Sequence, residues 1–155
     1  MNTEVQFLVF RLDDRRYALR LTQVHQVVRS VDYTPIPSAP EIVLGIIDFR
    51  GEILPLLKTG NRFGHADRPV RLEDQFIIAR TARRTVALLV DEVNEVVALP
   101  SERIIAATGV IRDSVPKIQG VAQFDDGLIL IHDLETFLSQ DEEQSFARAL
   151  ASGGG

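Results

Sequence analysis

Hydrophobic and polar residues follow the same pattern twice along the chain. Residues 6–28 (QFLVFRLDDRRYALRLTQVHQVV) and 75–97 (QFIIARTARRTVALLVDEVNEVV) align without a gap, and nine of the 23 aligned positions are identical. In each copy, a run rich in Val, Ile, Leu and Phe leads into a polar turn and then into a second apolar run, a pattern that predicts a β-hairpin. We therefore expect two copies of one small β unit.

A second pair of segments extends the repeat. The segment GIIDFRGEILPLL, which begins at Gly45, resembles GVAQFDDGLILIH, which begins at Gly120; both have Phe four residues after the Gly and an apolar run after a turn. The first turn is Arg50-Gly51 and the second lies at 125–127, where an Asp-Gly pair favours a tight hairpin because Gly accepts positive φ. About five short strands are expected in each copy.

Three short helical segments are expected between the strands. Thr22 would cap one helical turn at 22–26, because Thr is a favoured N-cap residue. Pro40 would begin a short helix at 40–44, since proline is common in the first turn. Asp133 would cap a further helix that ends at residue 138.

The fold class predicted by this pattern is mainly β, with two small barrels packed side by side. Many short strands at regular spacing are typical of barrels and sandwiches. The first copy is mainly 5–59 and the second mainly 74–135, with a Gly- and Pro-containing linker at 59–73 and with exchange of strands between the copies left open. A C-terminal helix is expected at about 140–151, and the whole chain, 1–155, is treated as one domain.

Composition and charge exclude several classes of protein. The 155 residues carry a formal net charge of −5, which argues against nucleic-acid binding because that needs a basic face. There is no cysteine, so disulfides, thiolate chemistry and Cys-built zinc sites are excluded. No apolar run is long enough to span a membrane, and the N-terminal residues lack a signal-peptide pattern, so we expect a cytoplasmic protein with no direct membrane insertion.

Residues with catalytic or metal-binding chemistry are scarce. The three histidines, His25, His65 and His132, form no metal-ligand pair and lie near no nucleophile elbow, so each is expected at the surface. The acidic residues of the segment 91–95 lack the ligand number and the glycine of a calcium loop and are interpreted as a solvated turn. No catalytic residue, metal or cofactor is predicted, and the pattern favours a docking protein over an enzyme.

Several segments together resemble the CheW-like coupling proteins of bacterial chemosensory arrays. They are QFLVFRL…RYALRL, VHQVV from Val24, GIIDFRG from Gly45, VDEVNEV from Val90 and GLILI from Gly127. The resemblance covers residues 5–140. Its most specific element is GIIDFRGEILPL from Gly45, in which the Gly is followed by Arg-Gly and then by an apolar strand that contains proline. It implies two five-stranded SH3-like barrels around a shared apolar seam. It also implies an adaptor that joins the signalling tips of methyl-accepting chemoreceptors to the regulatory domain of a CheA-type histidine kinase.

The resemblance also assigns candidate interaction residues. In the family, the Arg of the N-L-R-G motif matters for receptor and kinase coupling. The resemblance matches that Arg, the Gly that opens its strand, the Val and acidic residue of the V-x-E segment and the valines of the D-x-V-x-x-V segment to positions of this chain. By motif position, the receptor and kinase interaction set is Val24, Gln26, Gly45, Arg50, Val93 and Val96. Four positions depart from the family pattern: Gln26 stands in place of Glu, Asp48 in place of Asn, and Lys58-Thr59 in place of Asp-Leu.

The residues themselves leave alternatives open. Arg50 is either a solvated turn residue or an interface anchor, and Val27 and Val96 are either core residues or part of a groove for an amphipathic helix. Two other functions are compatible with the sequence. One is an adaptor of a non-flagellar chemosensory pathway; the other is a β-barrel protein that binds a small ligand, for which a deep pocket with convergent polar groups is the distinguishing feature.

Overall fold

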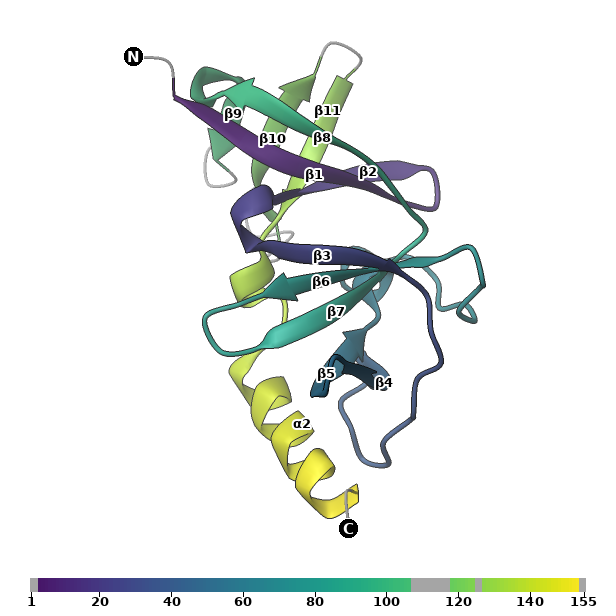
Figure 1. Ribbon diagram of the computed structural model, residues 1–155. Coiled ribbons are helices and arrows are strands. Elements are labelled where there is room, and N and C mark those ends of the chain that lie inside the picture. Colours follow the sequence, from purple (N-terminus) through teal and green to yellow (C-terminus); the bar gives the residue numbers. More distant parts are fainter. Residues whose placement is uncertain (1–2, 107–117, 125–126, 154–155) are drawn as a thin grey trace.

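The computed structural model describes residues 3–106, 118–124 and 127–153, and these form two β-sheets and a C-terminal helix (Figure 1). The first sheet runs in the order β8 (Glu92–Pro100), β1 (Glu4–Leu12), β2 (Arg15–Arg20), β11 (Gly127–His132), β10 (Ile118–Phe124) and β9 (Ile104–Ala106). The second sheet runs in the order β3 (Val24–Arg29), β6 (Gln75–Arg80), β7 (Thr85–Val90), β5 (Glu52–Leu57) and β4 (Val43–Phe49).

Each sheet contains strands from both copies of the repeat. The β1–β2 hairpin of the first copy pairs with β8 and β11 of the second, while the β6–β7 hairpin of the second copy pairs with β3 and β5 of the first. The two parallel pairs, β2 with β11 and β5 with β7, occupy equivalent places in the two sheets. The chain therefore crosses between the sheets at the end of β2 and again at the end of β7, and only the short β9 has no counterpart among the described strands.

Alternating side chains of the hairpin strands supply three apolar clusters. Along β1, Phe7 and Val9 point into the core of the first sheet, whereas Leu8 and Phe10 join a cluster between the sheets. Strand β6 repeats this arrangement in the second sheet. We call the cluster between the sheets the seam; its fully buried β-strand members are Phe10, Tyr17, Leu19, Leu57, Ile77, Ala79, Val86, Leu88 and Val90. Because successive side chains of a strand face opposite sides, both faces of these strands are buried.

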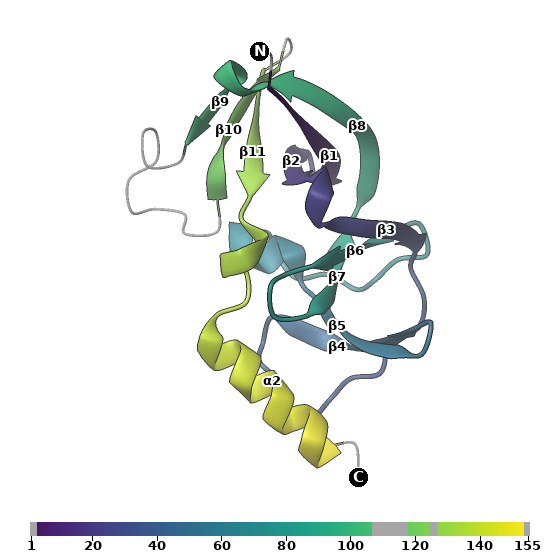
Figure 2. The ribbon, with the colours of Figure 1, turned by 60° about the vertical axis from the view of Figure 1, so that its left-hand side comes forward.

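The helix α2 (Gln140–Gly153) closes one side of the seam. Its start is a capping box, in which the Glu142 N–H donates to Ser139 Oγ at 3.1 Å and the Ser139 N–H donates to Glu142 Oε1 at 2.9 Å. Phe146 is fully buried in the seam, and the guanidinium of Arg84 lies over its ring. Arg84 also pairs with Glu143. The helix is thus attached to the β6–β7 hairpin by both apolar and ionic contacts. Figure 2 shows α2 below this hairpin.

The predicted mainly-β class with two subdomains and a C-terminal helix is confirmed; of the three short helices predicted between strands, the one at 40–44 is wrong and the other two are shorter 3₁₀ turns. At 40–44 the Val43 N–H donates to Pro40 O in a turn, and β4 begins at Val43 because that residue pairs with Leu57. Thr22 lies inside a 3₁₀ turn, Leu21–Gln23, that has no side-chain cap. The helix expected after Asp133 is a second uncapped 3₁₀ turn, Leu134–Thr136.

Two further predicted segments have different outcomes. The linker at 59–73 is not fully irregular, because it opens with a 3₁₀ helix, Thr59–Phe63. Of the predicted turn at 125–127, residues 125–126 lie outside the described residues, and Gly127 begins β11 with a positive φ of 138°. Among the helices of the described chain, none is long and apolar enough to cross a membrane.

Candidate functional site

The tip of the β4–β5 hairpin presents Arg50 to solvent on a rigid turn. Arg50 and Gly51 both have positive φ, 53° and 86°, as the two central residues of a type I′ turn require. The Gly51 N–H donates to Asp48 Oδ1 at 2.8 Å, which fixes the turn. The Arg50 guanidinium lies over the Phe49 ring at 5.1 Å from its centre, an arrangement that favours the cation and limits its motion. Arg50 is therefore an exposed, preorganised cation.

This hairpin tip is in contact with β3. The His25 ring meets the Phe49 ring edge-on, with 6.1 Å between the ring centres. His25 is the extra residue of a β-bulge, because Val24 pairs with Ala79 and Gln26 pairs with Ile78. A bulge bends a strand and redirects the side chain of its unpaired residue. Arg50 and Phe49, at the end of β4, thus form a continuous row with His25, which lies next to Gln26 on the edge strand β3.

Strand β8 is the corresponding edge of the first sheet and carries the same bulge. Val9 pairs with Glu95 and Phe10 pairs with Val93, which leaves Asn94 as the extra residue at the position equivalent to His25 in the repeat. Val93 packs on the seam, as do Val24 and Val27 on β3. Val96 is different, with 51% of its surface exposed. The two edge strands therefore share one apolar base and each presents a bulge.

Gly45 acts through the backbone. A Cβ added there would lie 2.4 Å from Thr34 O, 2.8 Å from Thr34 C and 2.9 Å from a ring carbon of Tyr33. Thr34 and Ile46 exchange two backbone hydrogen bonds of 2.9 Å across this contact. Only glycine permits such an approach, so Gly45 anchors the segment before β4 to the strand that ends at Arg50.

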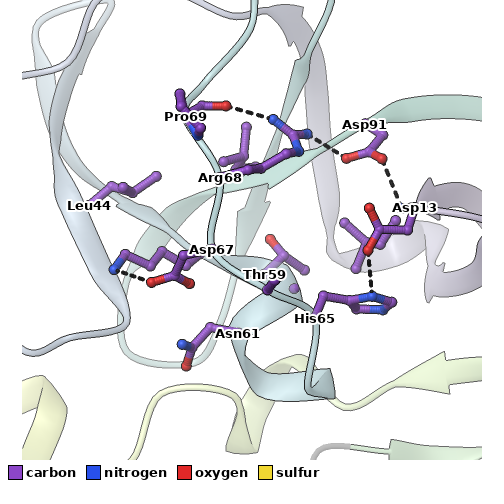
Figure 3. Close-up of a pocket in the computed structure, with 14 residues that line it drawn as sticks. Asp13, Leu44, Thr59, Asn61, His65, Asp67, Arg68, Pro69 and Asp91 are labelled. Carbon is purple, nitrogen blue, oxygen red and sulfur yellow. Dashed lines mark hydrogen bonds and ion pairs between the residues drawn. The ribbon is translucent and has the colours of Figure 1, made fainter.

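A cavity of about 340 Å³ lies between the loop that follows β5 and the β1–β2 turn (Figure 3). Its apolar walls include Leu12, Leu44 and Leu89, and its polar side groups include Lys58 and Asn61. The cavity has the size of a small-molecule site. Lys58 and Asp67 form an ion pair of 3.3 Å in its wall.

The polar wall of the cavity contains a buried ionic network that corrects the interpretation of Asp91 as a solvated residue. Arg68 Nη2 donates to Asp91 Oδ1 at 2.5 Å, and the Asp13 N–H donates to Asp91 Oδ2 at 2.8 Å. Arg68 also bonds both carboxylate oxygens of Asp74 at 2.8 Å. Burial alone would raise the pKa of Asp91, but these hydrogen bonds outweigh burial and hold its pKa below the ordinary value.

Two of the three histidines also differ from expectation. His65 bridges the loop and the β1–β2 hairpin, because its Nδ1 lies 2.8 Å from Asp13 Oδ2 and its Nε2 lies 2.9 Å from the Tyr17 hydroxyl. His132 is buried among aromatic rings, with 4.3 Å between its centre and that of Phe137. No sequence signal marked either one, since Asp13 and Tyr17 are distant from His65 along the chain, and Phe10 and Phe63, which also lie near the His132 ring, are distant from His132.

Comparisons with known proteins identify the family. A family model described as the CheW-like domain matches residues 6–142. The chain belongs to the CheW-like family. The chemotaxis protein CheW of Helicobacter pylori is 25% identical over 141 residues, which are 90% of this chain and 86% of that protein. Protein FrzA of Myxococcus xanthus is 37% identical over 54 residues, 35% of this chain and 34% of its own.

A solved structure in the same family has the same fold. The crystal structure of the scaffolding protein TtCheW from Thermoanaerobacter tengcongensis matches with a TM-score of 0.82 and 31% identity, over 90% of this chain and 96% of its own. The chain thus folds as two SH3-like subdomains, as predicted. Membership in this family makes it a non-catalytic chemotaxis adaptor or scaffold and not an enzyme.

Proposed function

We propose that this CheW-like protein couples the cytoplasmic signalling tips of chemoreceptors to the regulatory domain of a CheA-type histidine kinase. In this role it works in the cytoplasm and is recruited to membrane-associated receptor arrays. The observation that carries the proposal is the row of Arg50, Phe49 and His25, which holds an exposed guanidinium at a rigid hairpin tip beside an edge strand. A rigid, charged anchor next to apolar surface is what binding hot spots commonly contain.

The receptor is proposed to bind along the two edge strands. Val24 and Val93 supply the apolar base, Val96 adds exposed apolar surface, and Gln26 lies next to the bulge. A receptor tip in the form of an amphipathic helix would place its apolar face on the valines and its carboxylates or carbonyls within reach of Arg50, whose donors form a fixed fork. Gly45 contributes by shaping the strand that ends at Arg50.

The coupling itself would be thermodynamic. If the receptor's signalling state changes the contact free energy between adaptor and kinase, kinase activity follows that state without any catalysis by this chain. Many weak contacts in an array would give stability through avidity.

Replacement of Arg50 by Glu tests the proposal. Arg50→Glu reverses the charge at the anchor and is expected to abolish receptor-dependent kinase activation while the melting temperature changes little, because the side chain is exposed and its contact is with the neighbouring ring. The matched control is Arg83→Glu, which makes the same charge change at another exposed hairpin tip and should retain coupling. Full coupling by Arg50→Glu would contradict the proposed site.

Two other functions remain candidates. The cavity of about 340 Å³ favours a small-ligand protein, and a stabilising ligand would be seen as a rise in melting temperature without any receptor or kinase. An adaptor of a non-flagellar chemosensory pathway would use the same site to bind a different receptor and kinase. Binding to one kinase and receptor set in preference to another would separate that pathway from the flagellar one.

A further inference from the structure

Asp91 occupies the point at which the chain passes from one sheet to the other. It is the single residue between β7, which belongs to the second sheet, and β8, which belongs to the first. Its N–H donates to Arg11 O at 3.0 Å, so the backbone is already held to the end of β1. Any rotation about this residue would change the direction of β8 relative to the second sheet.

Arg68 joins this crossover to the start of the neighbouring strand β6, at the same end of the second sheet, where Gln75 pairs with Val90. Its guanidinium bonds Asp91 on one side and both carboxylate oxygens of Asp74 on the other, with three contacts between 2.5 and 2.8 Å. Asp74 immediately precedes β6, and its carbonyl accepts from the N–H of Ser30, which follows β3. One side chain therefore connects the start of β8 to the paired ends of β3 and β6.

The network is built to be stiff. The side chains of Asp74 and Asp91 are only 1% and 8% exposed, so both carboxylates depend mainly on protein donors, Arg68 among them, for their hydrogen bonds. Charge-assisted, bidentate hydrogen bonds such as those between Arg68 and Asp74 fix the orientation of the two side chains as well as the distance between them. The Arg71 N–H gives Asp74 a further bond of 2.6 Å, and Asp13 and Arg11 complete the surroundings of Asp91.

The first residues of β8 are also bonded to the start of β6. The Val93 N–H donates to Gln75 Oε1 at 2.7 Å, only two residues beyond the crossover. Gln75 in turn pairs with Arg29 at the end of β3. The position of Val93 on β8 and the position of the end of β3, at Arg29, thus depend on one set of polar contacts at the crossover.

We infer that Arg68 is a positioning residue that sets the angle between β3 and β8 and thereby the shape of the partner-binding surface between them. The effect on partner binding rests on the proposed function, whereas the effect on the angle between β3 and β8 does not depend on it. Arg68 touches no partner in this scheme; it acts through Asp91 and Asp74. Removal of the guanidinium would leave the sheets folded on their apolar clusters and free the crossover to take other angles.

Distance measurements within the full chain test the geometry. Because the chain has no cysteine, Cys substitutions at the exposed positions Arg29 on β3 and Glu95 on β8 can be spin-labelled without side reactions. The labelled protein should give one narrow distance distribution by double electron–electron resonance. Arg68→Gln should broaden or shift that distribution, and Arg71→Gln should not, because Arg71 is about half exposed and its guanidinium lies 3.9 Å from either carboxylate.

Arg68→Gln leaves Asp74 buried with fewer partners, so a second variant protects the test against loss of folding. Asp91→Asn keeps the Arg68–Asp74 pair and removes one charge from the crossover; it should shift the same distribution. Folded Asp91→Asn protein with the parent distribution would overturn the inference, whatever Arg68→Gln does.

A binding readout connects the geometry to function. Retention of Arg68→Gln on receptor-containing membranes should be about five- to tenfold weaker, within the usual range of coupling between distinct sites. Rescue by Arg68→Lys should be partial, because a single ammonium cannot bond both carboxylates in a fixed plane. An altered distance with unaltered retention would refute the inferred role in binding, while loss of retention by Arg50→Glu alone would still support the proposed function.

Discussion

Replacement of Gly45 by Ala separates a structural role of this residue from direct contact with a partner. The new methyl group would meet Thr34 O at 2.4 Å and Thr34 C at 2.8 Å, both backbone atoms that cannot move away as a flexible side chain can. The segment at Thr34 must therefore shift, and the two hydrogen bonds it shares with Ile46, each 2.9 Å, must lengthen.

The size of the effect follows from these contacts. Overpacking by one methyl group in a tight site costs about 1–3 kcal/mol, and each weakened hydrogen bond adds up to about 1 kcal/mol. A total near 3 kcal/mol is a large part of the stability of a typical domain. For a chain of this length it corresponds to a fall in melting temperature of roughly 6–12 °C.

Thermal and urea unfolding of Gly45→Ala measure this loss directly. The control is Gly51→Ala, at a positive φ of 86° but with no atom within 4 Å of the added Cβ, which should cost only about 1–2 kcal/mol from backbone strain. Equal melting temperatures for Gly45→Ala and the parent protein would refute the reasoning. They would leave direct contact with a partner as the reason for glycine at this position.

Two further predictions concern the helix and the ionic contacts. Phe146→Ala should lower the free energy of unfolding by about 3–5 kcal/mol, because it empties a fully buried site where α2 meets the seam. Chemical denaturation measures this loss, and a change below about 1 kcal/mol would contradict the packing. The pKa values of Asp91 and Glu142 lie below their ordinary values of 3.8 and 4.5 in the folded protein, since hydrogen bonds outweigh burial at both sites. The stabilisation of the folded protein by these two carboxylates should be complete above about pH 4.5 and should disappear as the pH falls through the lower folded-state pKa values. Urea midpoints between pH 7 and pH 3 should therefore fall less in Asp91→Asn than in the parent protein. Identical pH dependence in the two proteins would contradict this prediction.

The strands were predictable from the sequence because their pattern is local. Phe7, Leu8, Val9 and Phe10 are apolar in a row, and a strand with both faces buried needs such a run. The short helices at 22–26 and 40–44 were mispredicted because a cap residue or a proline permits a helix without requiring one, and strand pairing began too early in both places for a helix to form.

The pairing between copies depends on contacts that no local pattern records. The two hairpins have the same apolar pattern, so this pattern does not determine which copy's strands each hairpin pairs with. The observed strand pairing places β3 and β8 at equivalent edges of the two sheets. It also gives both edges their bulges, at His25 and Asn94.

The site was predictable only where its chemistry is local. The Arg50-Gly51 turn follows from a glycine between two apolar runs, and family resemblance marked Arg50 itself. Asp91 was misinterpreted because its neighbours Glu92 and Glu95 are exposed, whereas its partner Arg68 lies in an irregular loop far away along the chain. The role of Phe49 and His25 was missed for the same reason, since their contact joins two separate strands.

Co-sedimentation with receptor-containing membranes and the CheA-type kinase of the same source tests the central claim most directly. Purified protein is mixed with both, pelleted, and assayed for kinase phosphorylation with and without the protein. The coupling role predicts joint pelleting and a receptor-dependent rise in phosphorylation that Arg50→Glu abolishes and Arg83→Glu retains. Absence of both binding and activation with every receptor and kinase of that source would contradict it.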